Sequence, residues 1–155
     1  MVSDVIFLNM IIEGHLFSDV WWGKVQRIYV IAYCPASGNN KDANWRFPKG
    51  ATEGSVGEVK NIYFSNIKCT SENGIYVSGE SADKIKNIVF DNGDVMTHKT
   101  TNIAGGVYDR RPANVDGFGN RKTSGFYFDK ATGITIRNCS LQWRTIKPAY
   151  FPHTV

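Results

Sequence analysis

Residues 59–66 read Val-Lys-Asn-Ile-Tyr-Phe-Ser-Asn, and residues 85–92 read Ile-Lys-Asn-Ile-Val-Phe-Asp-Asn. Both segments fit one template, in which apolar residues alternate with other residues, Asp, Asn or Gly stands third and Asn stands eighth. Alternation with a period of two is typical of a strand with one buried face. We therefore expect Ile62 and Phe64, like Ile88 and Phe90, to point into a core, with bends at the third and eighth positions.

The same template occurs twice more, at residues 2–9 and 131–138, and a short apolar segment follows each of the first three copies, at residues 28–30, 75–77 and 126–128. Each repeat is then a long strand, a bend and a short strand. The two middle copies start about 26 residues apart, the length of one coil of a parallel β-helix. The sequence predicts an all-β, parallel β-helix solenoid of about four coils. A β-sandwich also has many short strands, but the matched Asn positions favour the solenoid.

The longer intervals between template copies predict two long loop insertions, at residues 35–58 and at about 98–124. Loops longer than about 12 to 15 residues are uncommon in compact domains unless they serve a function. We expect both insertions to lie on the solvent side of the coils and to form whatever surface the protein uses.

Coils that stack in register place equivalent side chains above one another. The eighth-position asparagines would form a ladder of side-chain amides, and the tyrosines of the short segments an aromatic stack. The residues concerned are Asn9, Asn66, Asn92 and Asn138 for the ladder, and Tyr29, Tyr76 and Tyr127 for the stack. Glu72 and Glu80 flank the second short segment, where we expect solvated turn residues.

The composition indicates one globular domain over residues 1–155, with 42% hydrophobic and 21% charged residues. The net charge of +4 comes from basic residues that are scattered singly, so we expect no nucleic-acid partner. Every apolar stretch is far shorter than the roughly 20 residues of a membrane span, so no membrane partner is expected. The three histidines and three cysteines lie outside any metal-binding spacing, which predicts no metal and no cofactor.

Residues 18–30, 57–67 and 71–79, together with residues 105–112 and 123–128, are similar in order and spacing to the later coils of glycoside hydrolase family 28, the polygalacturonase and rhamnogalacturonase family. The resemblance runs over nearly the whole chain. It implies a right-handed parallel β-helix, a pectin-like, uronate-containing polysaccharide as partner, and secretion or a periplasmic location. No signal peptide can be read in the chain, which the resemblance identifies as a portion of a longer family-28-like chain.

Sugar sites combine aromatic side chains, which contact the C–H faces of the sugar, with polar groups that bind its hydroxyls. Sites for uronates also use the guanidinium group of arginine to bind carboxylates. Two clusters in this sequence have that composition. We expect these residues to bind substrate: Asp19, Trp21, Trp22, Lys24 and Arg27 in the first cluster, and Tyr108, Asp109, Arg110 and Arg111 in the second. A structural plug is the alternative role for the tryptophans, and a salt bridge is the alternative for the second cluster.

Catalysis in family 28 proceeds with inversion and needs carboxylates on both sides of the glycosidic bond. The family carries them as an Asn-x-Asp motif followed by an Asp-Asp pair, and this sequence has no two adjacent acidic residues. Asp116, in Asn-Val-Asp-Gly-Phe at residues 114–118, is the catalytic candidate, but it lies in the second insertion. We expect a hydrolase-like chain that is catalytically incomplete. The alternative is a non-catalytic β-helix that binds carbohydrate or self-assembles.

The ends of the solenoid provide the last expectation from sequence. A first or last coil without a capping element exposes an apolar stacking surface. The template begins at Val2, with no amphipathic helix before it. We therefore expect self-association through exposed coil ends, either end to end or side by side.

Overall fold

The computed structural model describes residues 1–17, 28–33, 56–109, 118–120, 123–144 and 146–152. The strands among them are β1 (Val2–Gly14), β2 (Tyr29–Ala32), β3 (Val59–Ser71), β4 (Ile75–Gly79), β5 (Ile85–Thr97), β6 (Val107–Asp109), β7 (Phe118–Asn120), β8 (Phe126–Asp129), β9 (Thr132–Arg137) and β10 (Ser140–Trp143). These residues contain no helix, and so none long and apolar enough to cross a membrane. The predicted all-β class is confirmed.

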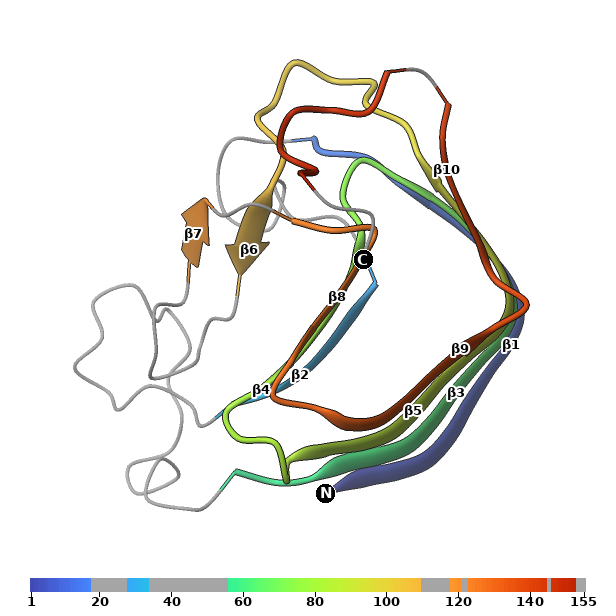
Figure 1. The fold of residues 1–155 in the computed structure, drawn as a ribbon, viewed down its shortest axis with the longest axis vertical. Helices are drawn as coiled ribbons and strands as arrows, with labels where there is room; N and C mark the ends of the chain where they lie inside the picture. Colours follow the sequence, from blue (N-terminus) through green and yellow to red (C-terminus); the bar gives the residue numbers. More distant parts are fainter. Residues whose placement is uncertain (18–27, 34–55, 110–117, 121–122, 145, 153–155) are drawn as a thin grey trace.

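Two parallel sheets form the body of the protein. The large sheet has the order β1-β3-β5, with β9 and β10 both pairing with the far side of β5. The small sheet has the order β2-β4-β8. Along the chain, strands of the two sheets alternate, and Figure 1 shows equivalent strands stacked over one another. We call these levels the first layer (β1, β2), the second (β3, β4), the third (β5, β8) and the fourth (β9, β10).

The bends at the third and eighth template positions have a left-handed backbone. The φ angle lies between 52° and 59° at Asp4, Asn9, Asn61, Asn66, Asn87, Asn92 and Asn138, and is 65° at Gly133. Asp, Asn and Gly tolerate this region best. The predicted bends are confirmed, but the strands do not end at them, since β1, β3 and β5 each continue for 13 residues through both bends. Pairing persists because bends in adjacent layers coincide, so neighbouring strands turn together.

The predicted asparagine ladder is confirmed across the first three layers. Asn66 Nδ2 donates to Asn9 Oδ1 at 2.9 Å, and Asn92 Nδ2 donates to Asn66 Oδ1 at 2.6 Å. The fourth member differs, because Asn138 Nδ2 donates to Asp91 Oδ1 at 3.2 Å. The strand is interrupted at that bend, between the end of β9 and the start of β10, which shifts this amide relative to the ladder.

A second ladder occupies the third template position, where the sequence predicted only a bend. Asn61 Nδ2 donates to Asp4 Oδ1 at 2.9 Å, and Asn87 Nδ2 donates to Asn61 Oδ1 at 3.1 Å. In both ladders each amide donates toward the first layer. The fourth layer has Gly133 at this position, and a Cβ there would collide with the Asn87 side chain.

Aromatic stacks run through both sheets. The predicted tyrosine stack is confirmed for Tyr76 and Tyr127, whose rings stack with centroids 5.2 Å apart. Tyr29 meets Tyr76 edge-on instead, with centroids 5.4 Å apart and the ring planes at 71°. A phenylalanine stack inside the large sheet was not predicted as such. Phe7 to Phe64 and Phe64 to Phe90 are both 4.9 Å between centroids, with nearly parallel rings.

The core lies between the two sheets and is covered best in the middle layers. The inward-facing side chains predicted from the alternation are buried there, with Ile62, Phe64, Ile88 and Phe90 between 0% and 7% exposed. Phe7 and Ile136 point the same way in the first and fourth layers, yet they are 38% and 39% exposed. The template position therefore decides whether a side chain points into the core. How deeply that side chain is buried depends on whether its layer has a neighbouring layer on each side.

The second insertion contains a small hairpin. β6 and β7 pair antiparallel, with Tyr108 opposite Gly119 and Asp109 opposite Phe118. In Figure 1 this hairpin lies beside the small sheet, on the side away from β5 and β9. The prediction of a long insertion between the third-layer strands is confirmed, while the strands within it were not predicted. Most of the first insertion lies outside the described residues.

Candidate functional site

A buried polar corner forms where β3 passes into β4. Glu72 and Asn73 make this turn, and both have no exposed surface. The Glu72 carboxylate lies 2.5 Å from Lys99 Nζ and accepts hydrogen bonds from the hydroxyls of Thr100 and Thr101 at 2.7 and 2.9 Å. The expectation of a solvated Glu72 is wrong, because the segment that follows β5 folds over it. Glu80, at the other end of β4, is half-buried.

The electrostatics of Glu72 define what this corner can do. Burial by itself raises the pKa of the carboxyl, but hydrogen bonds from Lys99, Thr100 and Thr101, with the charge of Lys99, outweigh burial and hold the pKa below its usual value. A general acid for glycoside cleavage needs a raised pKa. Glu72 is therefore ionised and fully hydrogen-bonded, and it holds the segment after β5 in place rather than acting as an acid.

The same corner holds the start of the β6–β7 hairpin. Asn73 Oδ1 accepts a hydrogen bond from the backbone N–H of Gly106 at 2.9 Å, directly before β6. The Tyr150 hydroxyl donates to the Glu72 carbonyl at 2.7 Å. The Tyr150 ring also lies so close to Gly105 that a Cβ at that residue would overlap it. The two glycines at 105–106 thus allow the backbone before β6 to pack directly against the Tyr150 ring.

The other end of the insertion is held by the same C-terminal segment. The backbone N–H of Thr123 donates to the Tyr150 carbonyl at 2.9 Å. Phe151, 1% exposed, packs edge-on against Trp143 of β10, with centroids 6.4 Å apart. Both ends of the insertion are therefore held against the stacked layers. No sequence pattern predicts these contacts, because the residues that make them are far apart along the chain.

The sequence-predicted substrate residues have the following positions. Tyr108 and Asp109 belong to strand β6 of the hairpin described above. Outside the described residues lie Asp19, Trp21, Trp22, Lys24, Arg27, Arg110, Arg111 and Asp116. Among the side chains that the structure does describe, no three of His, Cys, Asp or Glu gather in a way that could hold a metal ion.

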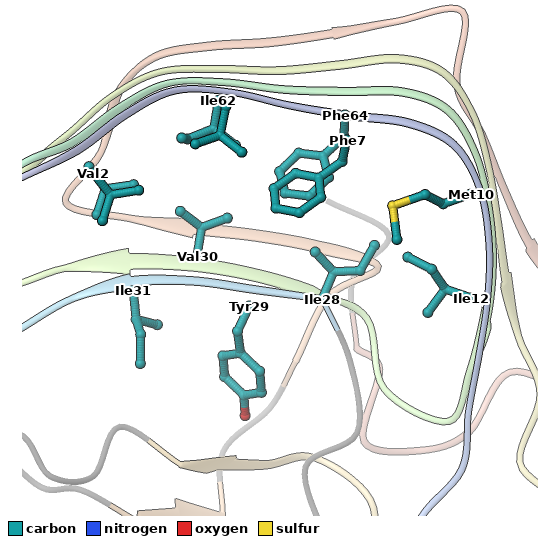
Figure 2. Close-up of a pocket in the computed structure, with 12 residues that line it drawn as sticks. Val2, Phe7, Met10, Ile12, Ile28, Tyr29, Val30, Ile31, Ile62 and Phe64 are labelled. Carbon is teal, nitrogen blue, oxygen red and sulfur yellow. The ribbon is translucent and has the colours of Figure 1, made fainter.

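An apolar cavity of about 450 Å³ opens at the first layer. Inward-facing residues of β1 line one side of it, Phe7 and Met10 among them, and residues of β2 line the other (Figure 2). Val59, Ile62 and Phe64 of the second layer form its floor. This cavity lies at the first-layer end of the core, and the described residues that line it carry no cluster of polar groups that would recognise a sugar.

Comparisons with protein-family models, with curated proteins and with solved structures found no match to this chain. The resemblance to glycoside hydrolase family 28 therefore stays a prediction.

Proposed function

We propose that this chain is a right-handed parallel β-helix that binds a uronate-containing, pectin-like polysaccharide, and that it is a family-28-like chain with incomplete catalytic machinery. The single observation that carries the binding proposal is the fixing of the β6–β7 hairpin by the buried Glu72–Asn73–Tyr150 corner. A platform held at both roots loses little conformational entropy when it binds a ligand.

Three features support the β-helix over the β-sandwich. All pairs in the two main sheets are parallel, whereas sandwiches are built from antiparallel sheets. Strands of the two sheets alternate along the chain, as coils require. Equivalent residues stack in ladders, a device that needs coils in register. Right-handedness follows the general rule for parallel crossovers.

The chemistry of the hairpin supports an acidic sugar as ligand. Tyr108 and Asp109 belong to β6, and Arg110 and Arg111 follow them directly in sequence, so the sequence combines an aromatic residue with two guanidinium groups in this hairpin. Guanidinium groups bind carboxylates in a forked geometry, which a neutral polysaccharide cannot use. The net charge of +4 also favours an anionic partner.

Binding is tested by calorimetric titration with oligogalacturonides, and with neutral galactan oligomers as a ligand control. We expect Arg110→Ala/Arg111→Ala to weaken oligogalacturonide binding at least tenfold, about 1.4 kcal/mol. The matched variant Lys68→Ala/Arg144→Ala removes the same charge from an exposed position of β3 and from the exposed residue directly after β10, and should retain wild-type affinity. Equal weakening in both variants, or equal affinity for the neutral glycan, would contradict the proposed site.

Catalysis is tested separately with a reducing-sugar assay on polygalacturonate and rhamnogalacturonan. We expect no turnover above background. Turnover that Asp116→Asn abolishes would show that the chain carries a functional acid, and would overturn catalytic incompleteness while leaving the binding proposal intact.

A further inference from the structure

Among the described residues, no further strand pairs beyond either end of the layered stack, and the first layer exposes apolar side chains there. β1 is one edge strand of the large sheet, and β9 with β10 forms the opposite edge. On β1, Val2, Phe7 and Met10 are 54%, 38% and 37% exposed around the cavity of Figure 2. An edge strand with exposed apolar side chains is a template for further strand pairing.

We propose that copies of this chain stack head to tail, with β1 of one copy pairing in parallel with β9 and β10 of the next. The pairing is confined to the large sheet, because the small sheet, in the part of the chain that the structure describes, ends one layer earlier, at β8. Such a contact is heterologous and does not close on itself, so it generates an open series of oligomers.

The register of the existing layers supports this arrangement. Within the protein, Val5, Ile62, Ile88 and Ile134 share one position, and Phe7, Phe64, Phe90 and Ile136 share another. Ile12, Cys69, Val95 and Leu141 share a third. Continuing the same register into a second copy places Val5 on Ile134, Phe7 on Ile136 and Ile12 on Leu141. Every inward apolar side chain of β1 then meets an apolar side chain.

The ladders have a polarity that fits the same order of copies. Each amide donates toward the first layer, as Asn66 does to Asn9. The same polarity, continued by one layer, directs the Nδ2 group of Asn9 toward the neighbouring copy. In the continued register Asn9 lies opposite Asn138 of the next copy. Asn138 uses its own Nδ2 on Asp91, which leaves its Oδ1 as the acceptor that Asn9 requires.

Charge favours contact between unlike ends. The first layer carries the acidic residues Asp4 and Glu13, with no Lys or Arg among its described residues. The described residues from β8 onward include four basic residues, Lys130, Arg137, Arg144 and Lys147, against one acidic residue, Asp129. Arg137 is already paired with Asp91 of the third layer, so the other three of these residues carry the unpaired positive charge of this end. Complementary potentials of this kind select the partner face and its orientation.

A symmetric face-to-face dimer fits the strand less well. Two copies of β1 would pair antiparallel, and matching their bends would set Asp4 opposite Asn9. That alignment places Val5, which faces the cavity, opposite Leu8, which is 53% exposed on the outer face. Shifting this antiparallel pairing by one residue places inward-facing side chains opposite one another again, but the bends of the two β1 strands then no longer coincide. Only the parallel contact matches faces and bends together.

Disulfide formation tests the register directly. Met10 would lie opposite Cys139 of the next copy, so Met10→Cys should form a ladder of covalent dimers, trimers and longer species on mild oxidation. Wild type and Met10→Cys/Cys139→Ser are the controls and should not form it. Covalent dimers that persist in the double variant would overturn the proposal in favour of face-to-face contact.

Blocking one end at a time tests the polarity in sedimentation velocity. Phe7→Lys blocks the first layer, and Ile136→Lys blocks the fourth. Each alone should weaken association at least tenfold, while an equimolar mixture should form a dimer of one copy of each, because each retains the end that the other lacks. Circular dichroism checks that both variants fold.

A third variant distinguishes head-to-tail stacking from side-by-side contact. Ile11→Lys changes an outer-face residue of β1 that is 78% exposed, and should leave association within twofold of wild type. Loss of association in Ile11→Lys with retention in Phe7→Lys would show lateral contact and overturn the proposal. A wild-type chain that stays monomeric up to 100 µM, with no disulfide ladder from Met10→Cys, would overturn it as well.

Discussion

Phe7 and Phe64 occupy the same template position in adjacent layers, but their surroundings differ. Their rings stack at 4.9 Å, and Phe64 has Phe90 at the same distance on its other face. The second face of Phe7 borders the open cavity instead, so Phe7 is 38% exposed and Phe64 is 7% exposed. The repeat decides where a side chain points, and the number of covering layers decides how much that side chain stabilises the fold.

The largest expected effect comes from shortening these two rings. Phe64→Ala should lower the free energy of unfolding by about 3–5 kcal/mol, because it leaves a cavity in a core that is covered on both sides. Phe7→Ala should cost about 1–2 kcal/mol, since part of the ring is already in water. Urea unfolding at low micromolar protein measures both. Equal losses would contradict the difference between end and middle layers.

Removing the charge of Glu72 should have the next largest effect. Glu72→Gln leaves the Lys99 ammonium without its carboxylate, and should cost about 2–3 kcal/mol, below the 3–5 of a fully buried pair because Lys99 is 24% exposed. Asp91→Asn is the matched variant, since Asp91 pairs with Arg137 at 2.8 Å on the surface. Exposed pairs contribute little, so its urea midpoint should stay near that of wild type. A larger loss in Asp91→Asn would show that burial does not set the strength of these pairs.

The asparagine ladder should give a smaller difference. Asn66→Ala removes two ladder hydrogen bonds and places alanine at a φ of 54°, for an expected cost of about 2 kcal/mol. Asn9→Ala removes one ladder bond at a φ of 56° and should cost about 1.5 kcal/mol, because the backbone term is the same and only one hydrogen bond is lost. The measurement is again urea unfolding, and a loss at Asn9 as large as at Asn66 would mean that the ladder bonds are energetically negligible beside the backbone term.

The smallest effect concerns pH. Because the pKa of Glu72 is lowered from 4.5, its contribution is complete above that value and is lost as pH falls through the folded-state pKa. The pKa of Asp83 is lowered from 3.8 to about 2, chiefly by hydrogen bonds from Ser81 and Lys84, so its contribution is lost only below pH 3.8. Unfolding midpoints between pH 6 and 3 should therefore fall less steeply in Glu72→Gln than in wild type, with the two curves parallel above pH 5. Parallel curves throughout would mean that Glu72 titrates alike in the folded and unfolded chain.

The sequence predicted much of the fold because one strand template recurs along the chain. Period-two alternation identified the inward side chains of β1, β3, β5 and β9, and the recurring Asn at the eighth position identified three rungs of a ladder. The break between β9 and β10 was not predicted, since the template residues continue through it without change.

The corner site could not be read from the sequence for a physical reason. Glu72 looked like a surface turn residue, and only the return of the chain after β5, about 27 residues later, supplies Lys99 and the two hydroxyls that make its burial possible. Tyr150 contacts Glu72 across a separation of 78 residues. No local pattern of hydrophobicity or charge encodes a contact between segments that do not repeat.

Hydrogen exchange of individual backbone amides tests the central contrast between end and middle layers most directly. At submicromolar protein, amides of β3 and β5 should exchange slowest and those of β1 at least a hundredfold faster. The reason is that β1 has a neighbouring strand on one side only, whereas β3 has one on each side. At 100 µM, stacking of copies should slow exchange in β1 and leave β3 unchanged. Protection of β1 equal to that of β3 at submicromolar protein would contradict the account.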